Sequence, residues 1–147
     1  MKQVTVSGAI ILRTREVSPL RQSSGTADTV FQKEIFATQR GYGDWKGWWE
    51  FPGSKLEPGE TPLQCIEREI REELATQVKA EEVLGVIDYD YPDFHLTMHC
   101  ILCTIMSGDL KLLEHEAARW LSKESLRSVN WLPADQLILD KIEEILK

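Results

Sequence analysis

The chain has 147 residues, with 24 acidic and 17 basic side chains and a formal net charge of -7 at pH 7. This length suffices for one hydrophobic core, so we expect a single domain over residues 1–147. The excess of acids argues against a general nucleic-acid-binding protein, because affinity for a phosphate backbone comes from clustered Lys and Arg. No apolar run has the length of a membrane span and the N-terminus has no signal-peptide pattern, so we expect a cytoplasmic protein without a membrane partner.

The first third of the chain predicts two strands and an aromatic segment. Val4–Leu12 is the first predicted strand, a polar connection through about Lys33 predicts a hairpin loop, and Glu34–Thr38 is the second strand. The segment that follows, GYGDWKGWW, is dense in glycine and tryptophan. Two interpretations of its tryptophans stay open, a wall on which a base stacks and a hydrophobic lid over the core. These residues are Trp45, Trp48 and Trp49.

A helix is predicted to begin in the run Thr61-Pro62-Leu63-Gln64. Thr61 suits the N-cap position, Pro62 the first helical position with its fixed φ, and Gln64 the reciprocal partner of a capping box. On a helical wheel the apolar residues form one arc and three glutamates form the neighbouring arc. The apolar arc consists of Leu63, Ile66, Ile70 and Leu74, and the acidic arc of Glu69, Glu72 and Glu73.

The acidic arc has two possible explanations. Like charges four residues apart destabilise an isolated helix by roughly 0.2–0.5 kcal/mol, a penalty that a divalent cation would remove. If the apolar arc is buried against a sheet, the three carboxylates are held rigidly, and the preceding turn-rich loop can bring Glu60 to the same place. Such a set of oxygen ligands suits Mg2+ or Mn2+, which share their coordination with substrate phosphates. The alternative is a solvated face on which Arg68 and Arg71 pair with acids one turn away.

The second half of the chain predicts more strands and a final helix. We expect strands near Val83–Tyr89 and His95–Ser107, a strand or loop segment around Glu114–Leu121, and a helix from about Ala134 to Leu146. Strands accompanied by two helices indicate an α/β sandwich.

The three cysteines are an odd number without a disulfide framework, which suits a reducing cytosol. Cys100 and Cys103, with His95 and His99 close by, leave a zinc site open as an alternative. Side chains three apart in a strand point to opposite faces, and the chain has no second Cys pair. We therefore expect these thiols to be core residues.

The segment from Ser54 to Thr76 resembles the Nudix hydrolase signature, which is Gly, five residues, Glu, seven residues, Arg-Glu, an aliphatic residue, any residue, Glu-Glu, any residue, Gly and an aliphatic residue. Ser54 and Ala75 replace the two glycines and Thr76 replaces the closing aliphatic residue. If the family's loop needs positive φ at the glycines, Ser54 and Ala75 carry strain or shift the loop. The resemblance implies a Nudix α/β/α sandwich with a mixed β-sheet and a loop-helix-loop catalytic motif. The residues that match the signature in type are Glu60, Arg68, Glu69, Ile70, Glu72 and Glu73.

Five segments narrow the resemblance to the MutT-like nucleoside triphosphate pyrophosphohydrolases: IFATQR, EFPGSK, YDYPDFHLT, EHEAARWLS and LPADQLILDKI. By position, Arg40 resembles the family's substrate-contacting arginine and Lys55 the lysine after its glycine pair. Glu114 matches a family glutamate implicated in metal binding. The alternatives are a surface role for Arg40 and surface pairing of Glu114 with Lys111 or His115.

The same resemblance implies a base pocket. Asp93 and Phe94 fall on the strand-end loop that edges this pocket, although Pro92 and Asp93 could equally be turn residues. Asp135 matches the Asn or Asp that reads the base, with a plain helix cap as the alternative. An ionised Asp only accepts hydrogen bonds, so a base that presents N–H groups is expected, and both cytosine and 8-oxoguanine satisfy this.

The resemblance further implies Mg2+- or Mn2+-dependent hydrolysis of (deoxy)nucleoside triphosphates to monophosphate and pyrophosphate. Glu69, Glu72 and Glu73 are expected as principal ligands with Glu60 and Glu114 completing the set. Glu69 or Glu72 would be the general base, and Arg68 would orient the glutamates through charge-assisted hydrogen bonds.

We expect a substrate of the 8-oxo-dGTP type, as in cleaning of the nucleotide pool for DNA repair, with CTP or a modified dCTP as the alternative. Two further alternatives are another Nudix substrate class, such as ADP-ribose or a dinucleoside polyphosphate, and a catalytically inactive nucleotide-binding module. The expected assembly is a monomer or a weak homodimer.

Overall fold

The computed structural model describes residues 2–17, 30–110 and 117–147. The strands in these ranges are β1 (Lys2–Val17), β2 (Val30–Gln39), β3 (Trp49–Glu50), β4 (Gly53–Lys55), β5 (Gln77–Tyr91), β6 (Phe94–Ser107) and β7 (Ala117–Leu121). The helices are α1 (Pro62–Leu74), the 3-10 helix η1 (Asp135–Ile138) and α2 (Leu139–Ile145). No helix among these residues has the length and apolar character needed to cross a membrane.

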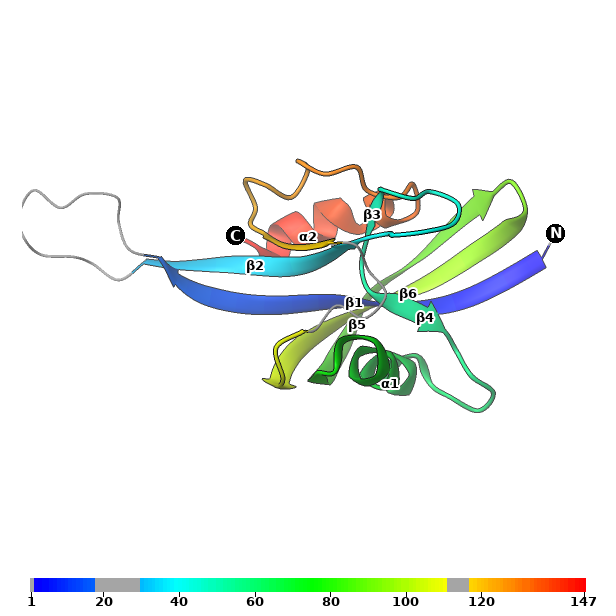
Figure 1. Ribbon diagram of the computed structural model, residues 1–147, viewed down its shortest axis with the longest axis horizontal. Helices are drawn as coiled ribbons and strands as arrows, with labels where there is room; N and C mark the ends of the chain where they lie inside the picture. The colour runs from blue at the N-terminus through cyan, green and yellow to red at the C-terminus, as the bar shows by residue number, and fades with distance from the viewer. Residues whose placement is uncertain (1, 18–29, 111–116) are drawn as a thin grey trace, which may run out of the picture.

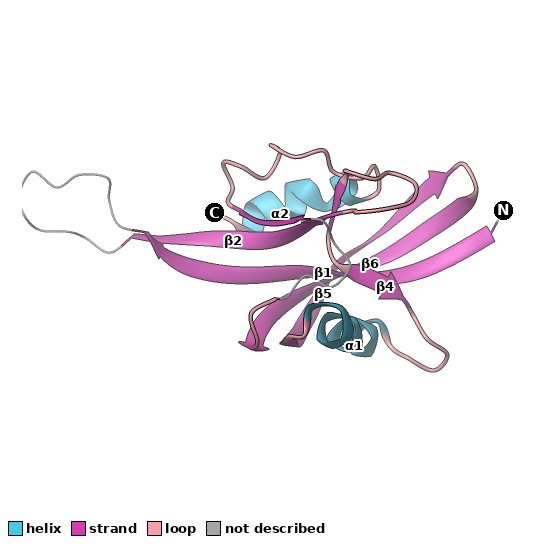
Figure 2. Cartoon of the chain, in the orientation of Figure 1, coloured by secondary structure: helices cyan, strands magenta, loops and turns pink. Residues whose placement is uncertain are grey.

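The strands form a mixed sheet with α1 on one face and α2 on the other (Figures 1 and 2). The strand order is β3-β2-β1-β6-β5, with β4 paired to β1 and β7 paired to β2. The pair β1–β6 is parallel and the other ladders are antiparallel. The predicted α/β/α sandwich with a mixed sheet is confirmed.

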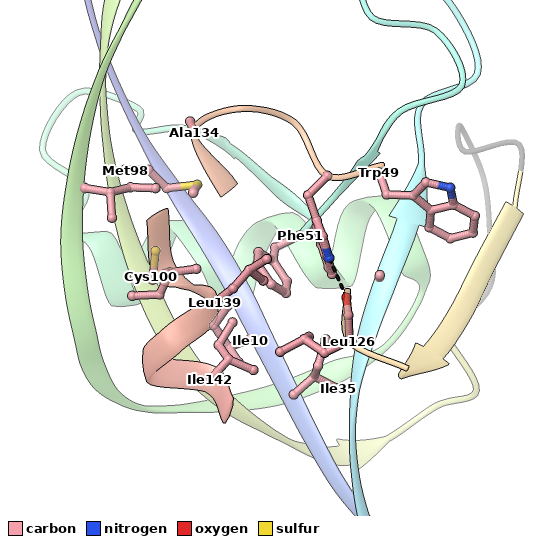
Figure 3. Packing of buried hydrophobic residues seen from close by; sticks show 14 of the residues in the cluster. Ile10, Ile35, Trp49, Phe51, Met98, Cys100, Leu126, Ala134, Leu139 and Ile142 are labelled. Carbon is pink, nitrogen blue, oxygen red and sulfur yellow. Dashed lines mark hydrogen bonds between the residues drawn. The ribbon is translucent and has the colours of Figure 1, made fainter. Parts of the chain in front are cut away.

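Two hydrophobic cores lie on opposite faces of this sheet because successive side chains of a strand alternate between faces. The α2-side core contains Ile10, Met98 and Cys100 of the strands, and Figure 3 shows Leu139 and Ile142 of α2 lying toward them. The α1-side core takes the alternate strand positions together with the apolar face of α1. Its members include Ala9, Ile11, Ile101 and Cys103 of the strands and Ile66, Ile70 and Leu74 of α1.

The two strand cysteines lie where the alternation places them. Cys100 belongs to the α2-side core and Cys103 to the α1-side core, and both side chains are fully buried. Burial raises the pKa of each thiol to about 12. His95, the candidate partner in a zinc site, instead contacts the carboxylates of Asp88 and Asp90, at 2.9 and 2.6 Å. The interpretation of the thiols as core residues is confirmed.

The start of α1 follows the predicted capping box. The Thr61 hydroxyl accepts a hydrogen bond from the Gln64 backbone N–H at 3.1 Å, and the Gln64 side chain accepts one from the Thr61 N–H at 3.0 Å. Pro62 occupies the first helical position, where its missing N–H costs nothing. These local interactions set the rotation at which α1 begins, and Ile66 and Ile70 then face the sheet.

Three predicted strand boundaries were wrong. One is the start of β5, which begins at Gln77 and not near the predicted Val83. The expected loop between residues 12 and 34 is strand at both ends, because β1 continues to Val17 and β2 begins at Val30 (Figure 1). The polar residues there pair across the ribbon: Arg13 and Arg15 donate to the Glu34 carboxylate at 2.9 and 3.1 Å. Residues 18–29 lie outside the described residues.

The final helix also differs from its prediction, because its first turn is the 3-10 helix η1 before α2 begins at Leu139. The N-cap residue, Ala134, has no side chain that can cap the turn, and the N–H of Leu137 bonds back to the Ala134 carbonyl at 3.1 Å. Such tight i to i+3 turns are common at helix ends.

The departures from the signature glycines have different structural consequences. Ala75, the C-cap of α1, is left-handed with φ 49° and ψ 39°, a region that costs a non-glycine residue about 1–2 kcal/mol. Ser54 lies in β4 and is absent from the positive-φ residues. Thr76 is buried, and its hydroxyl donates to the Leu74 carbonyl and accepts from the Leu110 N–H. The expected strain is thus present at Ala75 alone.

We therefore predict that Ala75→Gly raises the free energy of unfolding by about 1 kcal/mol, because glycine adopts this conformation without steric cost. Urea unfolding followed by circular dichroism measures the change. Ser54→Gly is the control and should be neutral or destabilising by roughly 0.5–1 kcal/mol, because glycine weakens a strand. Equal effects of the two substitutions would contradict the assignment of strain to Ala75.

Candidate active site

Two adjoining cavities open beside the sheet and share Arg40, Glu50 and Gly53 in their linings. The first, which we call the aromatic cavity, has a volume of about 410 Å³ and falls within the range typical of small-molecule sites. The second, the acidic cavity, has a volume of about 280 Å³. Apart from the shared residues, the aromatic cavity is lined mainly by Trp45, Phe51, Tyr91, Phe94, Leu96, Met98, Leu132 and Asp135, and the acidic cavity by Gly41, Tyr42, Gly43, Glu69 and Glu73.

The acidic cavity brings together two carboxylates of α1, Glu69 and Glu73, one helical turn apart. The Glu69 side chain is only 12% exposed. Burial, and then the charge of Glu73, raise the pKa of Glu69 to about 7. A partly desolvated carboxylate beside a second carboxylate forms an environment that a cation stabilises.

Arg68 holds two further signature acids outside this cavity. Its guanidinium donates to both oxygens of Glu60, at 2.7 and 3.0 Å, and to Glu72 at 3.2 Å. These bonds, and one from the Glu57 N–H, lower the pKa of Glu60 to about 2. The expected convergence of all four carboxylates is therefore corrected: the guanidinium satisfies Glu60 and Glu72, and neither lines the acidic cavity.

The donor set suits a hard cation, because the charged side chains that line the acidic cavity are carboxylates together with Arg40. Among residues 2–17, 30–110 and 117–147, no three His, Cys, Asp or Glu side chains converge closely enough to hold a metal ion by themselves. Glu69 and Glu73 would supply part of the shell. Glu114, the other expected ligand, lies outside the described residues.

Asp135 lies at the wall of the aromatic cavity and is 4% exposed. One carboxyl oxygen, Oδ2, accepts a hydrogen bond from the backbone N–H of Phe51 at 2.9 Å. Burial raises its pKa to about 8, so the carboxyl holds its proton at pH 7. The expectation of an ionised acceptor is corrected, because a neutral carboxyl also donates. The helix-cap alternative is not supported, since Ala134 occupies the N-cap position.

The other predicted pocket residues also gather at the aromatic cavity. Asp93, Phe94 and Lys55 all line it, as does Arg40. Each interpretation of the tryptophans fits a different residue. Trp45 lines the aromatic cavity, as expected of a wall on which a base stacks. Trp49 packs into the α2-side core and is 6% exposed, as expected of a hydrophobic cover.

Glu50 and Tyr91 are among the cavity residues that sequence reasoning missed. Glu50 lines both cavities, and its signal was a single acid between the buried residues Trp49 and Phe51. The Tyr91 ring stacks on Phe94 with 5.1 Å between centroids, and its hydroxyl accepts a hydrogen bond from the Ala134 N–H at 3.2 Å. Tyr91 lies in the segment YDYPDFHLT, and the resemblance of this segment to the MutT-like enzymes is the signal that could have found it.

The model of the NUDIX domain family matches residues 29–141, which is most of the chain and includes every residue that lines the acidic cavity. The chain belongs to the NUDIX domain family. It is therefore a Nudix hydrolase, an enzyme that acts on phosphoanhydride bonds.

Among its curated relatives is the 8-oxo-dGTP diphosphatase of Escherichia coli K12, 30% identical over 65% of this chain and 74% of that protein. Another is the CTP pyrophosphohydrolase of the same strain, 31% identical over 74% of this chain and 80% of that protein. The solution structure of the E. coli ORF135 protein is similar with a TM-score of 0.72 and 28% identity, over 99% of this chain and 91% of that chain.

The buried Asp135 predicts a pH-dependent stability that an amide would remove. Its folded pKa of about 8 lies above its ordinary 3.8, so the unfolded chain releases a proton that the folded protein retains. The contribution of Asp135 to stability therefore falls as the pH rises from about 4 to 8. Relative to wild type, Asp135→Asn should gain unfolding free energy over this window, on the order of 5 kcal/mol by pH 8.

Urea unfolding of both proteins at pH 5 and pH 8 measures this difference. Asp93→Asn makes the same substitution at an exposed position of the aromatic cavity. Its unfolding free energy relative to wild type should not increase between pH 5 and pH 8. A constant difference between wild type and Asp135→Asn at the two pH values would show that Asp135 is ionised in the folded protein.

Proposed function

We propose that this Nudix hydrolase splits a (deoxy)nucleoside triphosphate into the monophosphate and pyrophosphate, with 8-oxo-dGTP as its substrate. The observation that carries the proposal is the junction of the two cavities. An aromatic cavity with a buried hydrogen-bonding acid suits a base, and an adjoining cavity with Glu69 and Glu73 suits cation-bound phosphates. Arg40 and Glu50 lie between them, where a ribose and the first phosphate would pass.

The reaction requires charge stabilisation more than covalent chemistry. Mg2+ or Mn2+, held by Glu69 and Glu73 together with Glu114, would neutralise phosphate oxygens and acidify a bound water. Of the two candidate bases, Glu69 is the better placed, because Arg68 holds Glu72 outside the acidic cavity. Arg68 binds Glu60 and Glu72 through hydrogen bonds and also lies 3.9 Å from Glu69, so it orients the acids on both sides of the cavity rim.

The neutral carboxyl of Asp135 favours 8-oxoguanine over guanine. In the proposed complex Oδ2, which accepts from the Phe51 N–H, also accepts from the base, and Oδ1 donates the carboxyl proton. A donor beside an acceptor matches the edge of 8-oxoguanine, where O6 accepts and N7–H donates. Guanine presents two acceptors at this edge and leaves one of them facing an acceptor. The relatives that are named 8-oxo-dGTP diphosphatase support this choice, and with it a role in cleaning the nucleotide pool of the cytoplasm, within one catalytic domain.

CTP or a modified dCTP is the second candidate, favoured by the CTP pyrophosphohydrolase relative. Cytosine also presents an acceptor, N3, beside the amine donor at C4, so the same carboxyl can bind it. A panel of 8-oxo-dGTP, dGTP, CTP, 5-methyl-dCTP and ADP-ribose, with pyrophosphate and phosphate measured separately, separates these substrates. Hydrolysis of none of the triphosphates would refute the proposal, and cleavage of ADP-ribose alone would assign a different Nudix substrate class.

We predict that activity requires Mg2+ or Mn2+ and is lost in excess chelator.

We also predict that Glu73→Gln lowers kcat by at least about two orders of magnitude while the fold is retained. Glu82→Gln removes the same charge from β5 and should leave kcat unchanged. Pyrophosphate release against Mg2+ concentration measures both variants. A loss of tenfold or less, with an unchanged Mg2+ requirement, would assign Glu73 to a solvated helix face. A loss for Glu72→Gln as large as that for Glu73→Gln would require Glu72 to leave Arg68 during turnover.

A second prediction concerns base selection by Asp135. Asp135→Ala should lower kcat/KM for 8-oxo-dGTP by roughly 2–4 kcal/mol, because base groups are left unpaired, while poor substrates change little. Asp135→Asn retains a donor and an acceptor and should stay within about tenfold of wild type. Above pH 8 wild type should lose preference for 8-oxo-dGTP as the carboxyl ionises, whereas the Asn variant should not. An equal decrease for every nucleotide in Asp135→Ala would place base recognition elsewhere in the cavity.

A further inference from the structure

A bidentate ion pair lies at the junction of the two cavities. Arg40 donates from Nη2 to Oε1 of Glu50 at 2.9 Å and from Nε to Oε2 at 3.2 Å. A third bond runs from Nη1 to the Asp44 carbonyl at 3.3 Å. Arginine has five N–H donors in a rigid plane, so two donors, one on each terminal nitrogen, remain after these bonds. The guanidinium is therefore fixed in orientation and still able to bind an anion.

The local fold explains why these two side chains meet. Arg40 directly follows β2 and Glu50 lies in β3, which pairs with β2 through Thr38 and Gln39. The Glu50 side chain is 20% exposed, between two residues that pack into the core. A carboxylate this desolvated requires a paired charge, and Arg40 provides it.

Glu50 lines the acidic cavity from β3, and both of its carboxylate oxygens accept hydrogen bonds from Arg40. An arginine bound through two parallel hydrogen bonds to a carboxylate is pre-organised, and less freedom is lost when it binds a second anion. The same guanidinium also fastens the loop that carries Trp45, through the Asp44 carbonyl.

We propose that Glu50 is a positioning residue: it fixes Arg40 at the junction, with the two remaining N–H groups directed at the ribose and first phosphate of a nucleotide that spans both cavities. Glu50 contacts neither the base nor the metal and acts through Arg40. This inference rests on the proposed function, because it requires a substrate with a base in one cavity and phosphates in the other.

The test is a double-mutant cycle with Glu50→Gln, Arg40→Ala and the double variant, assayed on the preferred triphosphate. Glu50→Gln should raise KM about tenfold while kcat falls less than about threefold, because a binding group is misplaced and the hydrolytic residues are intact. In the Arg40→Ala background the same substitution should have no further effect. The Mg2+ concentration for half-maximal activity should equal that of wild type.

Glu143→Gln is the matched control. It breaks another arginine–glutamate pair, in which the Arg127 Nε donates to Glu143 at 2.6 Å, and this pair lines neither cavity. It should leave KM unchanged. If Glu50→Gln does not fold, Glu50→Asp carries the test: the charge stays but the reach shortens, so KM should rise less than in Arg40→Ala and the effect should again vanish in that background.

The outcomes separate this inference from the proposed function. A wild-type enzyme that hydrolyses no triphosphate refutes the proposed function, and this inference falls with it. With an active wild type, three results overturn only the positioning role: a KM of Glu50→Gln at or below that of wild type, additive effects with Arg40→Ala, or a raised Mg2+ requirement. The last result would make Glu50 a metal ligand.

Discussion

Burial of the apolar face of α1 is the constraint on which the acidic cavity depends. Ile66, Ile70 and Leu74 are fully buried, and complete burial of such a side chain contributes about 1.5–3 kcal/mol. Repulsion between acids one turn apart costs only roughly 0.2–0.5 kcal/mol on an exposed helix. Packing therefore outweighs repulsion, and Glu69 and Glu73 are held toward the cavity at whatever angle the apolar face requires. A helix fixed less firmly would rotate its carboxylates toward solvent.

Arg68 and Arg40 then divide the remaining acids by the same physical rule, which is that a partly buried carboxylate needs a charged donor. Arg68 satisfies Glu60 and Glu72 at the rim, and Arg40 satisfies Glu50 at the junction. The carboxylates left facing the acidic cavity are the ones that α1 itself directs there. The negative charge at the site is thus concentrated at one place, although the chain as a whole carries 24 acids.

At the aromatic cavity, the protonation of Asp135 depends on desolvation. Asp135 is almost completely buried and accepts a backbone hydrogen bond from Phe51, and its burial raises its pKa to about 8. Its proton makes it a donor as well as an acceptor, which determines which base edges it can bind. The same burial makes Asp135 a cost to stability above its ordinary pKa, as is common for residues kept for binding and not for folding.

The sequence by itself determined the features that arise within a few residues. The capping box at Thr61 and Gln64, the apolar and acidic arcs of α1 and the opposite faces of Cys100 and Cys103 follow from local hydrogen bonds and from the periods of helix and strand. The family signature pointed to the acids of α1 and its loop, and the MutT-like segments pointed to the candidate pocket residues, which line the aromatic cavity. The ends of β1 and β2 were missed because cross-strand pairing of Arg13, Arg15 and Glu34 stabilises polar residues that resemble a loop.

Only the tertiary structure decided which of these residues form ion pairs and which are buried from solvent. It placed Asp135 against the N–H of Phe51, 84 residues away, and removed the water that would have ionised it. It also brought Arg40 and Glu50 to the junction and tied Glu60 and Glu72 to Arg68. Desolvation and long-range ion pairing depend on how both faces of the sheet are packed. A local pattern of residues does not contain this information, because the contacting residues are far apart in the sequence.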